Sequence, residues 1–80
     1  MIIDTNGFEI GDEVWIPSSM EYKNFSPRLY GKCLEDDGFA LSVLLNETTK
    51  FIEWICRSNC HHTEQECQLE CDRLNGEYHD

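Results

Sequence analysis

Thiols and imidazoles are concentrated in the last third of the chain, and they are the side chains best suited to metal or covalent chemistry. This cluster contains Cys56, Cys60, His61, His62, Cys67 and Cys71. Thiolates and imidazoles are the ligands that zinc prefers, and residues one helical turn apart can supply two corners of a tetrahedral site. Cys67 and Cys71 have this spacing, and Cys56 or Cys60 with one histidine could complete the site. A zinc-stabilised domain is therefore one hypothesis.

The same cysteines also have a purely structural interpretation, which we favour. Structural zinc sites usually contain cysteines separated by two residues, whereas three residues separate both cysteine pairs of this cluster. We expect Cys67 and Cys71 to be small core residues that let a helix lie close to a sheet, and Cys33 and Cys56 to be inward positions of strands. The odd total of five cysteines, without an export signal, favours reduced thiols over a disulfide framework.

Catalysis is not expected. The chain has no recognisable Ser-His-Asp arrangement and no glycine-rich phosphate loop. Cys60 and His61 are neighbours, but an activated thiol also needs an orienting group and a cleft, which so small a domain can hardly enclose. We therefore predict a non-enzymatic protein that needs no cofactor unless the zinc hypothesis holds.

Length and charge narrow the class of protein further. With 80 residues and a 40% apolar content, the chain has room for one modest core and one domain, residues 1–80. The formal net charge of −10 repels phosphate backbones and anionic membranes, so we expect neither direct nucleic-acid binding nor membrane association. No signal peptide and no membrane-spanning run is visible, and this predicts a cytoplasmic protein with a protein partner.

The elements that must position these residues are mostly strands. Alternating apolar residues and turn signals predict strands near residues 10–16, 28–34, 39–45 and 50–56. Pro17 should end the first strand, residues 18–27 form a surface loop, and Asn6-Gly7 marks a hairpin turn. The prediction is an α+β, mostly β fold: a small SH3-like barrel of four to five antiparallel strands over about residues 1–58, with a C-terminal helix over about 63–75.

Two sequence patterns predict which residues face the core and where the helix begins and ends. Period-2 alternation places four apolar side chains on the core face of the third strand: Phe39, Leu41, Val43 and Leu45. The S/T-x-x-E pattern makes Thr63 the N-cap of the helix, with Glu66 closing back on it, and Asn75-Gly76 supplies a C-terminal stop.

Aromatic side chains are one candidate binding surface. The chain has more large aromatic residues than one small core must contain, and aromatic residues are preferred anchors of protein interfaces. The predicted contacts are Trp15, Tyr22, Phe25 and Tyr30. An interface of this kind should be nearly indifferent to salt.

Acidic side chains are the other candidate surface. They recur in the turn after the second strand and along the helix, as Glu35, Asp36, Asp37, Glu66 and Glu70. Such a row could imitate the charge of a nucleic-acid backbone and block a basic cleft, although a solvated face is the ordinary interpretation. A complex formed by charge mimicry should weaken steeply with salt.

Three motifs carry a resemblance to a known group of proteins. These are Gly-Asp-x-Val-Trp at 11–15, the acidic turn that ends in Gly38, and the helix Thr-x-x-Glu-Cys-x-x-x-Cys-Asp-Arg-Leu-Asn at 63–75. The chain resembles the small SH3-like barrel proteins encoded by phages and prophages, in which Cys67 would replace an alanine. The resemblance implies a barrel closed by a helix and binding to a host or phage protein.

The leading hypothesis is therefore a non-enzymatic, phage-type protein-binding module. The alternative is an acidic, anti-CRISPR-like inhibitor that mimics nucleic acid and blocks a host defence or DNA-handling protein. The sequence does not name the partner or the oligomeric state.

Overall fold

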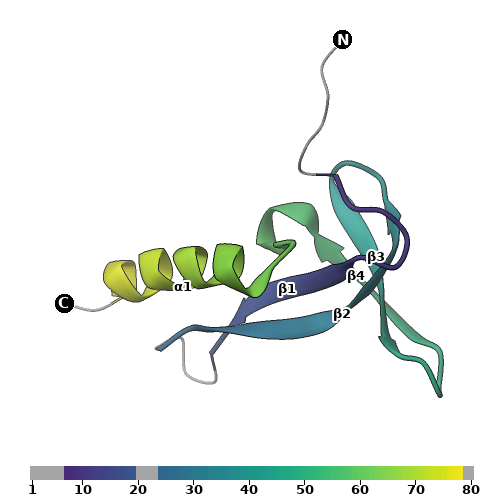
Figure 1. Cartoon of the computed structure of the whole chain (residues 1–80), viewed down its shortest axis with the longest axis horizontal. Helices are drawn as coiled ribbons and strands as arrows, with labels where there is room; N and C mark the ends of the chain where they lie inside the picture. Colours follow the sequence, from purple (N-terminus) through teal and green to yellow (C-terminus); the bar gives the residue numbers. More distant parts are fainter. Residues whose placement is uncertain (1–6, 20–23, 79–80) are drawn as a thin grey trace, which may run out of the picture.

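Four strands follow one another along the chain and pair in the same order (Figure 1). The computed structural model describes residues 7–19 and 24–78. Its elements are β1 (Glu13–Ser18), β2 (Ser26–Asp36), β3 (Ala40–Asn46), β4 (Phe51–Cys56), the short 3-10 helix η1 (Arg57–Asn59) and the helix α1 (Glu64–Tyr78). All strand pairs are antiparallel. The predicted α+β class, mostly β with one C-terminal helix, is confirmed.

The sheet is open, because β1 and β4 occupy its two edges and do not pair with each other. The chain nevertheless returns to β1 after η1. There the Trp15 amide donates to the His61 carbonyl (2.9 Å) and the His61 amide donates to the Trp15 carbonyl (2.8 Å). This single bridge fixes the segment that leads into α1 against the first edge strand, where a closed barrel would have a full strand pair.

The turn between β2 and β3 is built from side-chain oxygens and one glycine. Asp36 accepts a hydrogen bond from the Gly38 amide, and Asp37 accepts from the amides of Phe39 and Ala40. Gly38 has a φ of 94°, a conformation that costs glycine little and other residues much more. The predicted acidic turn that ends in Gly38 is therefore confirmed.

The core lies between the sheet and α1, which packs mainly against β1 and β2 (Figure 1). Its fully buried side chains are Val14, Cys33, Leu41, Val43, Cys67 and Cys71. Half of these are cysteines, whose small volume lets the helix approach the strands closely. The predicted core positions of Cys67, Cys71 and Cys33 are confirmed.

Two predicted core positions are wrong. Phe39 is 84% exposed because β3 begins only at Ala40, so this side chain belongs to the turn. Cys56 is exposed because successive strand residues alternate between faces: Ile55 turns towards the core, which leaves Cys56 on the other face. Leu41 and Val43 are buried as predicted, and Leu45 is half-buried against the core.

The start of α1 follows the sequence pattern more closely than its end. The Thr63 hydroxyl accepts a hydrogen bond from the Glu66 amide (3.1 Å), which confirms the N-cap, but the Glu66 carboxylate accepts from the His62 amide rather than from Thr63. The predicted stop at Asn75-Gly76 is wrong, since the helix continues to Tyr78. The Asn75 side chain instead accepts from the Phe25 amide (2.6 Å) and donates to the Phe25 carbonyl (3.1 Å).

The boundaries at the first turn also differ from the prediction. β1 passes through Pro17 to Ser18, with Pro17 opposite Pro27, so the loop is shorter than predicted. The end of an edge strand tolerates proline because fewer of its amides are needed for pairing. The predicted Asn6-Gly7 turn falls partly outside the described residues, and no helix within those residues is long and apolar enough to cross a membrane.

The close contact of β2 with β3 predicts the effect of two glycine substitutions. A Cβ at Gly31 would lie 2.4 Å from the Leu44 carbonyl oxygen, whereas a Cβ at Gly76 in α1 would meet nothing within 4 Å. Gly31→Ala should lower the free energy of unfolding by about 1–3 kcal/mol through overpacking. Gly76→Ala should raise it by up to about 1 kcal/mol, because alanine favours helix. Urea denaturation measures both, and shifts of the same sign would contradict the packing described.

Candidate interaction surface

The cysteine and histidine cluster is divided between separate environments. Cys67 and Cys71 are buried on the inner face of α1, whereas Cys56 is exposed at the end of β4. The Cys60 thiol donates a weak hydrogen bond to the Cys56 carbonyl (3.5 Å). The His62 ring stacks on Phe8 with 3.8 Å between ring centroids. Within the described ranges, which include all six predicted ligands, no three His, Cys, Asp or Glu side chains are placed to hold a metal ion. The zinc hypothesis therefore gains no geometric support.

The thiols differ sharply in acidity. Burial raises the pKa of Cys60 and of Cys67 to about 12, and it also raises the pKa of Cys33 and Cys71. At Cys56 the Ser58 hydroxyl, 3.2 Å from the sulfur, and the Ser58 amide stabilise the thiolate and lower its pKa. Cys56 is therefore the thiol that ionises most readily, whereas Cys60, the thiol considered for catalysis, is held protonated.

A hollow of about 520 Å³ lies beside Cys56, between η1, the turn before β3 and the start of α1. Cys56, Arg57, Cys60, His61 and His62 contribute to its wall. Arg57 is neutralised by Asp36, with 3.4 Å between Nε and the carboxylate. The Cys60 thiol is directed to a carbonyl oxygen. The hollow thus brings together polar groups and one thiol of lowered pKa, that of Cys56.

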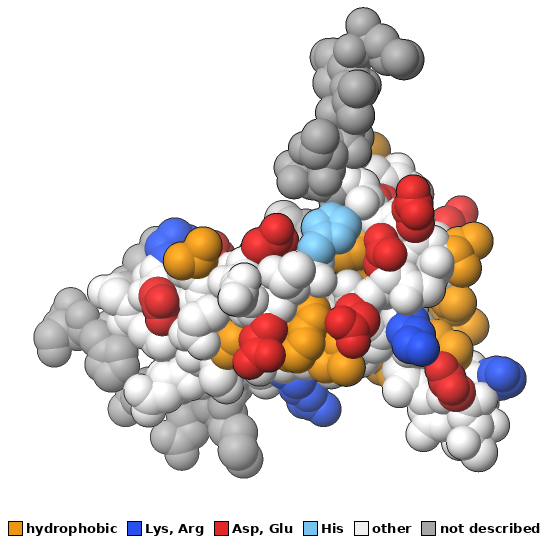
Figure 2. Space-filling model, viewed as in Figure 1, with side chains coloured by type: hydrophobic (Ala, Val, Ile, Leu, Met, Phe, Trp, Pro, Cys, Tyr) orange, Lys and Arg blue, Asp and Glu red, His pale blue; other side chains and the backbone are white. Residues whose placement is uncertain are grey.

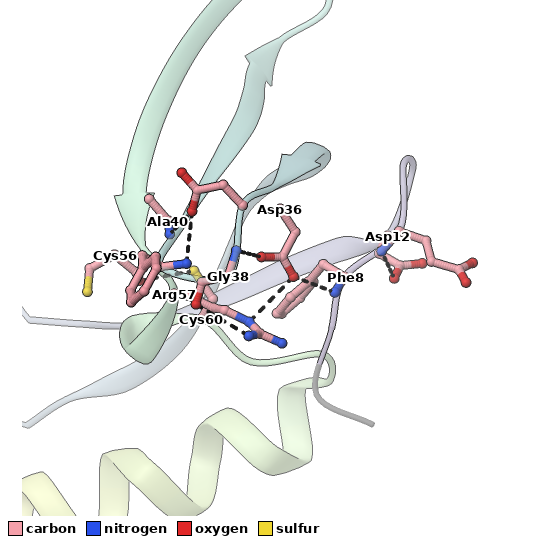
Figure 3. A network of polar contacts seen from close by, with 11 residues as sticks. Phe8, Asp12, Asp36, Gly38, Ala40, Cys56, Arg57 and Cys60 are labelled. Carbon is pink, nitrogen blue, oxygen red and sulfur yellow. Dashed lines mark hydrogen bonds and ion pairs between the residues drawn. The ribbon is translucent and has the colours of Figure 1, made fainter. Parts of the chain in front are cut away.

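Asp36 has several partners within the chain, and Figure 3 shows its contacts with Phe8, Gly38 and Arg57. Its carboxylate accepts hydrogen bonds from the amides of Phe8 (2.9 Å) and Gly38 (2.8 Å) and also pairs with Arg57. Its side chain is only 10% exposed. These contacts join three segments that are distant in sequence, so Asp36 is a structural residue of the turn.

The other predicted acidic residues are also largely used within the chain. Hydrogen bonds from the Ala40 and Phe39 amides lower the pKa of Asp37. Glu66 accepts from the His62 amide, and Glu70 forms an ion pair with Arg73, which lowers the pKa of Glu70. Glu35 is exposed on β2. The structure thus does not bring the five carboxylates together as one free acidic row.

The predicted aromatic contacts are less exposed than a binding surface requires. Trp15 is half-buried and its backbone forms the bridge to His61, while Phe25 is half-buried and held by Asn75. Tyr30 is half-buried and packs against the core. Tyr22 lies outside the described residues. None of the three described side chains is among the exposed large hydrophobic residues.

Three of the seven exposed large hydrophobic residues in the described part of the chain lie together on β4. Phe51 is 52% exposed, Ile52 47% and Trp54 55%. Ile52 lies opposite Leu44 and Trp54 opposite Ser42, so both side chains stand on the face of the sheet that Leu41 and Val43 do not use. In Figure 2 hydrophobic side chains are visible on the side of the molecule that carries β3 and β4 in Figure 1.

We call Phe51, Ile52 and Trp54 the β4 surface. The sequence analysis did not identify these three residues as a group, although the composition of β4 indicates them. β4 is apolar at both odd and even positions, and such a strand needs cover on both faces. Among the described residues there is one α-helix, α1, and it packs against β1 and β2. The β4 surface is therefore left uncovered by the described residues.

The Asp36 contacts predict a large effect of a conservative substitution. Asp36→Asn replaces one acceptor oxygen by an amide that faces donors and removes the carboxylate charge that lies 3.4 Å from Nε of Arg57. The free energy of unfolding should fall by about 2–4 kcal/mol. Glu47→Gln, which removes the exposed pair with Lys32, is the control and should leave the urea midpoint unchanged. Equal effects of the two variants would show that the contacts of Asp36 stabilise the fold no more than an exposed ion pair does.

The thiol environments predict selective alkylation. In the native, reduced protein iodoacetamide should modify Cys56 first, and the rate should rise with pH at values below those of an ordinary thiol, because its pKa is lowered. The four buried cysteines should react only on unfolding. Ser58→Ala should move the pH profile of the Cys56 reaction upward, and Cys56→Ser should abolish the fast reaction. Peptide mass mapping follows each site; fast labelling of Cys67 or Cys71 would contradict their burial.

Comparison with known proteins identifies no relative of this chain. No protein-family model matches it, and neither a curated protein nor a solved structure matches it. The interaction surface is therefore interpreted from its own geometry.

Proposed function

We propose that this chain is a non-enzymatic protein-binding domain that engages its partner through the β4 surface. The observation that carries the proposal is the exposure of three large apolar side chains, Phe51, Ile52 and Trp54, on one edge strand. Large exposed apolar groups that are contiguous mark interaction sites, and tryptophan is enriched among residues that dominate binding energy. Burial of one such side chain contributes about 1.5–3 kcal/mol.

Charge favours protein over the other macromolecules. The net charge of −10 opposes the approach of nucleic acids and anionic lipids. Basic protein surfaces, in contrast, are attracted to the chain at long range. A protein partner with an apolar contact and a basic surround therefore fits both properties of the domain.

The resemblance to phage-encoded SH3-like proteins remains part of this proposal. The return of the chain from η1 to β1, through the pair Trp15–His61, is the kind of connection that brings the edges of a small sheet together. A host or phage protein is the partner that the resemblance implies. Trp15 and Tyr30, predicted as contact residues, would then support the sheet rather than make the main contact.

Mimicry of nucleic acid has no comparable observation in its favour. Asp36, Asp37, Glu66 and Glu70 all make hydrogen bonds or ion pairs within the chain. Reversing the charge of Asp36 would disturb the fold as well as any mimicry, so such a variant does not separate the two hypotheses. Substitutions on β4 separate them better.

The experiment compares capture of partners from a host lysate by wild-type protein and by two variants of equal stability. The double substitution Ile52→Thr and Trp54→Thr places threonine, whose β-branched side chain favours strands, at both positions. It removes the two large apolar side chains. Leu69→Gln removes an exposed apolar side chain from α1 and is the matched control. A salt-resistant partner should be lost by at least about tenfold from the β4 variant, a change of about 1.4 kcal/mol, and be retained by the control.

Equal capture by wild type and the β4 variant would refute the proposal. Partners that are released from both proteins by high salt would support charge mimicry instead.

A further inference from the structure

The free edge of β4 has backbone groups available for pairing. The Arg57 amide donates to the Phe39 carbonyl (2.8 Å), which identifies that pair as a hydrogen-bonded one. Hydrogen-bonded and non-hydrogen-bonded pairs alternate along an antiparallel ladder. Glu53 and Ile55 therefore direct their backbone groups towards β3, whereas Ile52 and Trp54 direct theirs away from it.

One contact at the end of β4 supports this assignment. Cys56 belongs to the same alternating set as Ile52 and Trp54, and its carbonyl accepts the Cys60 thiol rather than a group of β3. The edge is thus closed at Cys56 by the chain itself. At Ile52 and Trp54 it is open with respect to the described strands, because β4 is the last strand of the sheet.

Natural edge strands usually carry features that prevent the addition of a further strand. These features are proline, inward-pointing charges, lysine or a bulge. The six residues of β4 include no proline and no lysine. Their one charged residue, Glu53, lies opposite the buried Val43 on the core face but is itself exposed. The register with β3 is regular from Ala40–Cys56 to Leu44–Ile52. The register shifts only between Leu44 and Asn46, at the start of β4. From Ile52 to Cys56 the edge is regular and apolar apart from Glu53, so it can accept an added strand that offers Glu53 a charge partner.

The side chains of β4 specify the chemistry of the added strand. Ile52 and Trp54 line one face and require apolar neighbours, whereas Glu53 stands on the opposite face, where a cation is the favourable neighbour. A strand that alternates apolar and basic residues meets both requirements. A second copy of this chain is disfavoured, because each copy carries a net charge of −10 and would bring its own Glu53 to the interface.

We infer that the free edge of β4 binds an extended segment of a basic partner protein, in which apolar residues alternate with lysine or arginine. The segment adds a fifth strand to the four-stranded sheet. Backbone hydrogen bonds to Ile52 and Trp54 supply the register, and the cation opposite Glu53 supplies selectivity. This inference rests on the proposed function and specifies its mode of binding and its class of partner.

The test uses the full chain and three synthetic peptides, followed by amide hydrogen exchange. The probe is an acetylated (Val-Lys)4 peptide, and the controls are (Val-Glu)4 and a (Val-Lys)4 peptide with two valines replaced by proline. With saturating (Val-Lys)4, exchange of the Ile52 and Trp54 amides should slow by about tenfold or more. The Glu53 and Ile55 amides, already bonded to β3, should change less. Neither control peptide should protect any β4 amide.

A charge exchange provides the matched protein variant. Glu53 is exposed, so Glu53→Lys should leave the fold intact. The variant should lose protection by (Val-Lys)4 and gain protection by (Val-Glu)4. Protection by both peptides in both proteins would overturn the selectivity that we assign to Glu53.

The outcomes distinguish this inference from the proposed function. If no peptide protects Ile52 and Trp54, yet the β4 variant still loses its lysate partner, strand addition is refuted and the binding surface stands. If the amides become protected as the protein itself is concentrated without peptide, the occupant is a second copy and the inference is wrong. If the β4 variant also retains its partners, both proposals fail.

Discussion

The carboxylate of Asp36 is the contact on which the arrangement of the chain most depends. It holds the Phe8 amide, the turn before β3 and the Arg57 side chain after β4. Because these groups come from the beginning, the middle and the later part of the chain, one side chain fixes the ends of the strand meander. The bridge between Trp15 and His61 then sets the path into α1. A buried charge can serve this purpose only when it is paired and hydrogen-bonded, as Asp36 is by Arg57 and two backbone amides.

The second constraint is the volume of a small core. One helix covers β1 and β2, and the cysteines on its inner face allow a close approach. The small core also leaves β4 without cover, because the described elements include no second α-helix that packs on it. Tight packing at one edge of the sheet and apolar exposure at the other thus have one cause. A chain of 80 residues buries a smaller fraction of its surface than a longer one, and here part of β4 stays exposed.

Local patterns predicted the elements well, and long-range contacts explain the differences. The strands, the acidic turn and the Thr63 cap depend on neighbouring residues, so the sequence reveals them. The exposure of Trp54 depends on which face α1 covers, which periodicity alone does not decide. The role of Asn75 depends on Phe25, from which it is separated by 50 positions. Asp36 appeared as one charge of a row, because its partners are likewise distant in sequence.

The order of the strands has a consequence for how the chain folds. Every strand pairs with its neighbour in sequence, so the sheet can grow from hairpins whose loop closure costs little entropy. The contacts between Phe8 and Asp36, and between Phe25 and Asn75, span 28 and 50 positions. They close large loops, and large loops close late. The cysteines on the inner face of α1 are therefore shielded from water only by contacts between segments that are distant in sequence.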